Sequence, residues 1–213
     1  MKEELESFYK NYHFKFAELI NTFPEKKFNG PLLISISELY IKQKRKLLVI
    51  GQETGGWDGF SDNVERSLKI YKDFNLGYSY NSPFGNSTRE IEKNLNLERC
   101  SCSWSNINKF DDGGGRPFGD SLKIIEKFDE VLLSEIQILK PDVVVFFSGP
   151  KFEYRINNLF ENVEFNEVKG FQNMQLSRLS HKLLPFNTYR TYHPRYLRQS
   201  KLEEKLVDYF KTI

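Results

Sequence analysis

The stretch KLLVIGQETGGWDG, residues 46–59, decides the fold of this chain. Its apolar run, residues 47–50, contains no polar residue, which is typical of a strand covered on both faces. Gly51, Gln52 and Glu53 follow the run at once, and two more glycines come soon after. We therefore expect a buried strand that ends in a polar loop where another molecule can approach the backbone closely.

Other apolar runs along the chain predict further strands, at residues 100–107, 142–149 and 187–192, with another strand expected at 163–168. Around and between the strands, the apolar spacing predicts helices at residues 3–20, 61–73, 120–140, 151–160 and 199–211. For residues 61–73 a lid is the alternative to a helix. Residues 74–90 are rich in turn-forming residues. Strands that alternate with helices predict an α/β fold, a three-layer α/β/α sandwich around a mostly parallel sheet of about four strands.

The composition fits one globular domain. The chain has 213 residues, enough for a substantial core, and it shows neither an internal repeat nor a linker, so we expect a single domain over residues 1–213. Its N-terminal amphipathic helix is expected over about residues 3–20. Its 19 Phe and 11 Tyr can build the core and leave aromatic rings for stacking. The formal charge of +2 neither requires nor excludes a nucleic-acid partner, because a basic face can occur in a nearly neutral chain.

Several classes of protein are disfavoured by simple patterns. No stretch reaches 18 apolar residues, so we expect no transmembrane helix and no contact with a membrane. The charged, amphipathic N-terminal segment does not resemble a signal peptide. Cys100 and Cys102 would point to opposite faces of a strand, and two thiols cannot supply a four-thiolate metal or cluster site. We expect a reduced, cytoplasmic protein without metal or cofactor.

Polar residues follow the predicted strands at the point where each strand ends. Glu53 comes after the first strand, Asn106 ends the second, Ser148 ends the third, and His193 follows the last. In an open parallel sheet, ligands bind beyond the carboxyl ends of the strands. We therefore expect these four side chains to meet at one edge of the sheet.

The motifs at these strand ends resemble those of the uracil-DNA glycosylase superfamily. The resemblance covers about residues 46–198 and rests on five segments in the family's order: IGQETGG, NSPFGNS, SWSNINKFDDGGGRP, LKPDVVVFFSG and YHPRYL. The chain departs from the usual pattern where Thr54 replaces a proline, Gly55 and Gly56 follow in place of a bulky tyrosine, and Arg195 replaces a serine. It lacks the four cysteines of the branch that binds an iron–sulfur cluster. The departures suggest a divergent member whose substrate is not limited to uracil.

The resemblance implies a role for each site residue. Glu53 and His193 would be catalytic, the first facing the sugar and the second donating a hydrogen bond to the departing base. Base-binding roles fall to Gln52, Phe84, Asn106 and Trp57. Contacts to the DNA backbone fall to Ser148, Arg195, Arg198 and Lys109.

These roles describe a monofunctional DNA glycosylase that acts as a monomer on single- or double-stranded DNA. The enzyme would hydrolyse the N-glycosidic bond of a flipped uracil, deaminated base or modified base and leave an abasic site. Two alternatives remain open from the sequence. One is a non-catalytic module of the same fold that binds nucleic acid or a partner protein, and the other is a hydrolase of free nucleosides or nucleotides.

Overall fold

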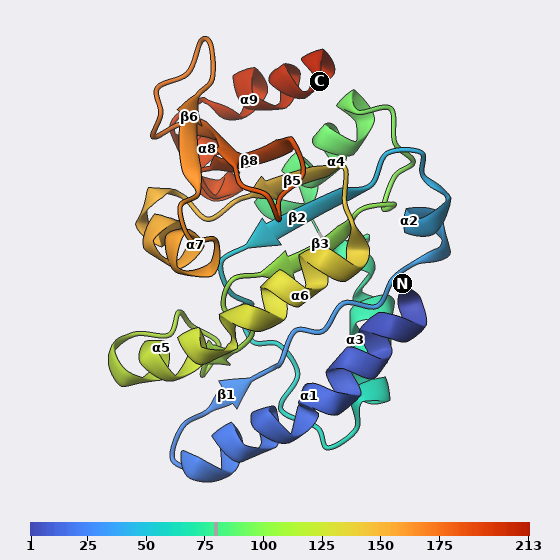
Figure 1. Ribbon diagram of the computed structural model, residues 1–213, viewed down its shortest axis with the longest axis vertical. Helices are drawn as coiled ribbons and strands as arrows, with labels where there is room; N and C mark the ends of the chain where they lie inside the picture. The colour runs from blue at the N-terminus through green and yellow to red at the C-terminus, as the bar shows by residue number, and fades with distance from the viewer. Residues whose placement is uncertain (79–80) are drawn as a thin grey trace.

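The central sheet has six strands in the order β3-β2-β5-β8-β7-β6 in the computed structural model, which describes residues 1–78 and 81–213 (Figure 1). The pairs β2–β3, β2–β5 and β5–β8 are parallel, whereas β7 pairs antiparallel with both β8 and β6. The strands are β2 (Leu47–Gly51), β3 (Ser103–Asn106), β5 (Val143–Phe146), β6 (Glu164–Glu167), β7 (Leu176–Ser180) and β8 (Asn187–Thr191). This confirms the predicted α/β class with a mostly parallel sheet.

The sheet is larger than the expected four strands because β6 and β7 extend it beyond β8. The sequence predicted β6 but missed β7. The sequence of β7, LSRLS, has two buried leucines and a half-buried Arg178, which is too few apolar residues for a distinctive pattern.

Helices cover the sheet in two contacting groups, with α1, α3 and α6 in one and α4, α8 and α9 in the other. The helices are α1 (Lys2–Thr22), α2 (Glu38–Lys42), α3 (Val64–Phe74), α4 (Pro83–Asn94), α5 (Gly119–Ile125), α6 (Asp129–Leu139), α7 (Glu153–Leu159), α8 (Pro194–Gln199) and α9 (Glu203–Tyr209). A small separate sheet pairs β1 (Phe28–Asn29) with β4 (Asp111–Asp112). Among the described residues, no helix combines the length and the apolar character that crossing a bilayer requires.

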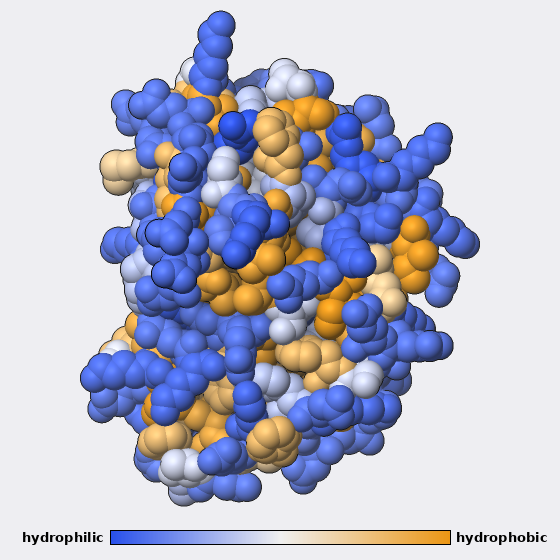
Figure 2. All heavy atoms as spheres, in the orientation of Figure 1, coloured by the Kyte–Doolittle hydropathy of each residue, from blue (hydrophilic) through white to orange (hydrophobic). Residues whose placement is uncertain are grey.

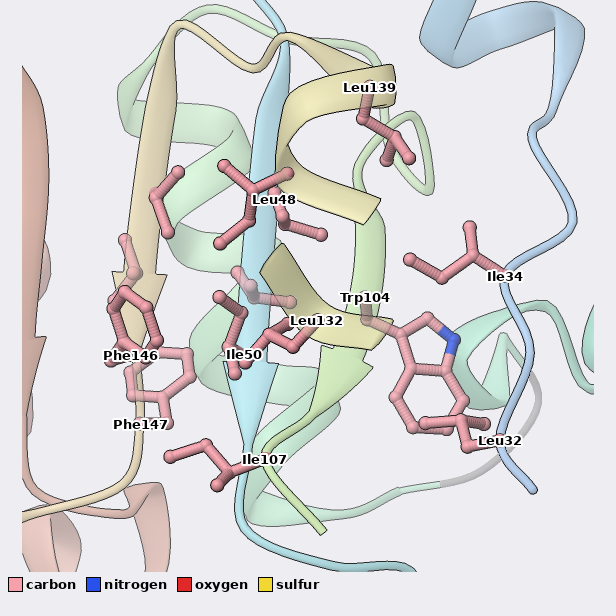
Figure 3. Close-up of a cluster of buried hydrophobic side chains, with 14 of the residues drawn as sticks. Leu32, Ile34, Leu48, Ile50, Trp104, Ile107, Leu132, Leu139, Phe146 and Phe147 are labelled. Carbon is pink, nitrogen blue, oxygen red and sulfur yellow. The ribbon is translucent and has the colours of Figure 1, made fainter. Parts of the chain in front are cut away.

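The core lies where α6 packs on the parallel strands. Leu132 and Leu139 of α6 face Leu48 and Ile50 of β2, and all four are buried (Figure 3). Every residue of β2 and β5 is buried, as the unbroken apolar runs predict. Figure 2 shows a mainly hydrophilic outer face with apolar side chains between the charged ones, the usual distribution for a folded domain.

The predicted helix at 120–140 is in fact divided. Residues 126–128 form a 3-10 turn between α5 and α6. Asp120, which resembles a helix cap in the sequence, lies inside α5, whose N-cap residue is Phe118. The break puts Asp129 in the first turn of α6, where Arg155 Nε donates to its carboxylate at 2.6 Å. A partner distant in the sequence thus interrupts a pattern that looks continuous locally.

The segment predicted as turns, residues 74–90, contains the start of α4. Ser82 caps this helix by accepting a hydrogen bond from Gly85 N at 3.0 Å, and Pro83 occupies its first position. A serine followed by proline is a recognised helix start, and the abundance of turn residues obscured it. Residues 79 and 80 of this predicted segment lie outside the described residues. The segment predicted as a helix or a lid at 61–73 forms α3, which begins at Val64 with Asn63 as its cap.

Candidate functional site

A pocket of about 360 Å³ opens at the carboxyl ends of β2 and β3. All six side chains predicted as catalytic or base-binding line it: Gln52, Glu53, Trp57, Phe84, Asn106 and His193. They come from the loop after β2, the start of α4, the end of β3 and the start of α8. Further lining residues, for which no site role was predicted, include Thr54, Phe74, Leu76, Ser82 and Trp104.

Gly51 allows the floor of the pocket to form. It is paired in register with Asn106 on the neighbouring strand, so the Asn106 side chain lies over it. A Cβ atom at residue 51 would be 2.4 Å from the Asn106 amide and 3.2 Å from the Phe84 ring. Only glycine leaves room for both side chains, which explains the glycine that ends the first apolar run.

Asn106 is buried and held by the backbone. Its amide, oriented to satisfy both of its groups, accepts from Thr54 N at 3.1 Å and donates to Ser105 O at 2.9 Å. The amide keeps a second N–H and a second oxygen lone pair. Asn106 therefore offers the pocket one donor and one acceptor in a fixed direction.

The buried carboxylate of Asp111 shapes the loop beyond Glu53. Its Oδ2 accepts hydrogen bonds from Thr54 Oγ1 at 2.8 Å, Gly56 N at 2.9 Å and Trp57 N at 3.1 Å. Thr54, a departure from the family pattern, thus contributes a hydroxyl that anchors this loop. The sequence analysis did not single out Asp111, because an aspartate before glycines is typical of an ordinary turn.

Glu53 is held from two sides. Arg116 Nε donates to its Oε1 at 2.9 Å, and Asn108 Nδ2 donates to its Oε2 at 3.2 Å. The Glu53 side chain is 13% exposed, whereas that of Arg116 is 49% exposed. Arg116 also binds the side-chain oxygen of Gln52, whose Nε2 donates to Ser148 O at 2.6 Å. Two of about four acceptor positions of the Glu53 carboxylate are therefore in use.

His193 faces the pocket as a neutral ring. It caps α8, and its Nδ1 accepts from Arg195 N at 3.2 Å, so the proton of the neutral ring resides on Nε2. Burial, followed by the charges of Arg116 and Arg195, lowers the pKa of His193 to about 4. The ring lies nearly parallel to Phe84, with centroids 6.3 Å apart and an angle of 28° between the planes. At neutral pH His193 is thus a hydrogen-bond donor without charge.

Aromatic rings form the opposite wall. Trp57 contacts Phe74 and Trp104 edge-on, at centroid distances of 5.4 and 5.6 Å. Phe84 packs edge-on against Phe147 at 5.5 Å. Next to Trp57, a Cβ atom added to Gly55 would meet no other atom within 4 Å. The pocket lining thus combines polar groups, including Asn106 and His193, with an aromatic cluster around Trp57.

Two residues predicted to contact a DNA backbone are inaccessible, and those predictions are wrong. Lys109 is fully buried, and its Nζ lies 2.5 Å from Glu135 Oε2 and 2.5 Å from Ser105 Oγ. Burial lowers the pKa of Lys109, although Glu135 opposes the effect. Ser148 is 1% exposed, so its hydroxyl cannot meet a phosphate, and only its carbonyl reaches the site by accepting from Gln52.

The other two predicted backbone contacts are exposed on α8. Arg195 stands beside the pocket, next to His193. Arg198 Nε donates to Glu203 Oε2 at 2.7 Å and lies over a separate hollow lined by residues of α4. Arg116, by contrast, reaches the pocket itself through its contacts to Glu53 and Gln52.

The polar side chains that line the pocket include a carboxylate, two amides and an imidazole. Within residues 1–78 and 81–213, no group of three or more His, Cys, Asp or Glu side chains is arranged to hold a metal ion. Both cysteines are free and buried. Known protein families give no match to the chain, and no curated protein matches its sequence.

Proposed function

We propose that the protein is a monofunctional DNA glycosylase with the three-layer α/β/α fold of the uracil-DNA glycosylase superfamily. It would hydrolyse the bond between the sugar and a flipped uracil, deaminated base or modified base and leave an abasic site. One observation carries the proposal: a carboxylate, an amide and a neutral imidazole, from three separate segments, line one pocket of nucleobase dimensions.

Glu53 would act on the sugar side of the bond. Cleavage of an N-glycosidic bond develops positive charge at the sugar, in a transition state like that of glycoside hydrolysis. A carboxylate held by Arg116 and Asn108 can stabilise that charge and orient the attacking water with its remaining acceptor positions. Water then adds to the sugar carbon and loses a proton to the Glu53 carboxylate, and the electron pair of the broken bond leaves with the base, which takes up a proton after release.

His193 and Asn106 would act on the base side. The departing base becomes negative, and the Nε2–H of a neutral His193 can donate to its oxygen, as donors do in an oxyanion hole. The donor and acceptor of Asn106 complement the paired carbonyl and N–H edge of a pyrimidine. Phe84, which lies parallel to His193, offers a face for stacking.

The aromatic cluster around Trp57 supports a base larger than uracil. Trp57, Phe74 and Trp104 provide an apolar wall in the same pocket as the residues that would read the base edge, and Gly55 leaves space next to Trp57. A substituent on the pyrimidine or the second ring of a purine would find apolar contacts there. Exposed Arg195 beside the pocket supports DNA as the partner, through contact to a phosphate.

The test is release of base from single- and double-stranded oligonucleotides that carry uracil, hypoxanthine, xanthine or a 5-modified pyrimidine. Alkali cleaves the resulting abasic site, and gel electrophoresis measures the product. We expect the Glu53→Ala and His193→Ala variants to lose at least 100-fold in rate, because each removes stabilisation of a transition-state charge.

Matched control variants separate chemistry from stability. Glu130→Ala removes a carboxylate of α6 that pairs with Lys15 of α1, and neither residue lines the pocket. His181→Ala removes a ring whose Nδ1 accepts from the backbone N two residues on, as in His193. Both should keep the wild-type rate. DNA binding without release of any base would instead support a non-catalytic nucleic-acid-binding module of the same fold.

A further inference from the structure

Asn108 joins the candidate catalytic carboxylate to the interior of the protein. It is fully buried, two residues beyond Asn106. Its backbone N donates to Gln52 O at 2.8 Å, and its side-chain Nδ2 donates to Glu53 Oε2 at 3.2 Å. One residue therefore holds both the backbone before Glu53 and the carboxylate itself.

A buried arginine fixes which way the Asn108 amide points. Arg155 of α7, 1% exposed, donates from one terminal nitrogen to Asn108 Oδ1 at 2.7 Å. A guanidinium can only donate, so the amide oxygen must face Arg155 and the amide NH₂ must face Glu53. Asp129 binds Arg155 through two nitrogens, and Glu126 lies 3.9 Å from a third. The carboxylate of Asp129 therefore holds Arg155, the positive charge of Arg155 fixes the orientation of the Asn108 amide, and that amide holds Glu53.

We propose that Asn108 is a positioning residue for the glycosylase reaction, with Arg155 as the group that orients it. This inference rests on the proposed function of Glu53. Asn108 holds Oε2 from the inside and Arg116 holds Oε1 from the solvent side, so the remaining acceptor positions of Glu53 keep a fixed direction. A neutral amide does this without adding charge, whereas a carboxylate at the same place would repel Glu53.

The Asn108→Asp variant tests this idea because the side chains have nearly the same shape. Arg155 would favour the ionised form of the new carboxylate, while Arg116 is the one cation paired with Glu53 among the described residues. Two neighbouring carboxylates cannot both stay ionised easily, so one of them holds a proton to higher pH. We expect the acidic limb of the pH–rate profile to move up by at least one pH unit. The rate at pH 7 should fall at least tenfold and recover partly at pH 9.

A merely structural role for Asn108 would give a different result. It would lower the rate by the same factor at every pH and leave the limb in place. Asn94→Asp is the matched control: Asn94 Nδ2 also donates a hydrogen bond, but to a backbone carbonyl, Val207 O at 2.6 Å, at the far end of α4. Its profile should coincide with that of the wild type.

Single-turnover assays with enzyme in excess, on the oligonucleotide that the wild type cleaves best, supply the pH–rate profiles, and multiple-turnover assays on the same oligonucleotide supply kcat and KM. If Asn108→Asp does not fold by circular dichroism, Asn108→Ser replaces it, with kcat expected to fall at least tenfold at unchanged KM. An unmoved acidic limb in folded Asn108→Asp, or an unchanged kcat in Asn108→Ser, would overturn the inference alone. Absence of base release by the wild type would remove the proposed function, and the inference with it.

Discussion

The neutral imidazole of His193 should make the folded protein sensitive to acid. In the folded state its pKa is lowered to about 4, against an ordinary value of 6.5. Above pH 6.5 the ring is neutral in both states and contributes nothing to pH dependence. Between pH 6.5 and 4 the unfolded chain binds a proton that the folded protein does not, so the free energy of unfolding falls as the pH falls.

The size of the effect follows from the shift. One pKa unit corresponds to about 1.4 kcal/mol, and pH 4.5 lies about two units below the unfolded value, so the upper limit at pH 4.5 is about 2.5 kcal/mol. The ring is only partly buried, and solvent screening reduces the figure, so we expect about 1–2.5 kcal/mol. That is a substantial share of the about 5–15 kcal/mol that stabilises a typical domain.

Urea unfolding of the wild type and of His193→Gln at pH 7 and pH 4.5 measures this effect. Glutamine has no titratable proton, so the variant should lose about 1–2.5 kcal/mol less than the wild type between the two pH values. His181→Gln serves as the control for removal of a histidine elsewhere. Equal losses in wild type and His193→Gln would refute a neutral, buried His193, and with it the proton assignment on Nε2.

Three further predictions concern the frame of the pocket. Gly51→Ala puts a Cβ atom 2.4 Å from the Asn106 amide, so base release should fall at least tenfold, whereas Gly59→Ala, where the Cβ meets open space, should leave the rate unchanged. Lys109→Met leaves Glu135 buried without its cation and should cost about 3–5 kcal/mol in urea unfolding, a loss that adding Glu135→Leu should largely restore. Asp111→Ala removes the acceptor for the backbone amides of Gly56 and Trp57, so the hydrogen exchange of these amides should accelerate at least tenfold. Unchanged exchange rates would show that the loop keeps its conformation without Asp111.

The sequence by itself determined those strands and helix starts that depend only on residues adjacent in the chain. The apolar run 47–50 and the apolar part of the segment 142–149, residues 143–147, predicted the central strands, because a short run without polar positions is typical of a strand buried on both faces. The strand ends then placed Glu53 and Asn106 at one edge, since parallel strands end on the same side. Serine and proline at 82–83 carried a helix signal that the surrounding turn residues obscured.

Only the tertiary structure decided which polar groups meet. Lys109 resembles an exposed loop lysine in the sequence, yet Glu135 of α6 neutralises it in the core. Asp111 and Asn108 look like ordinary turn residues, but one holds the loop after Glu53 and the other holds Glu53 itself. Apolar burial follows a period along the chain, whereas a polar side chain is satisfied by whichever partner the fold brings within hydrogen-bond distance, at any separation in the sequence.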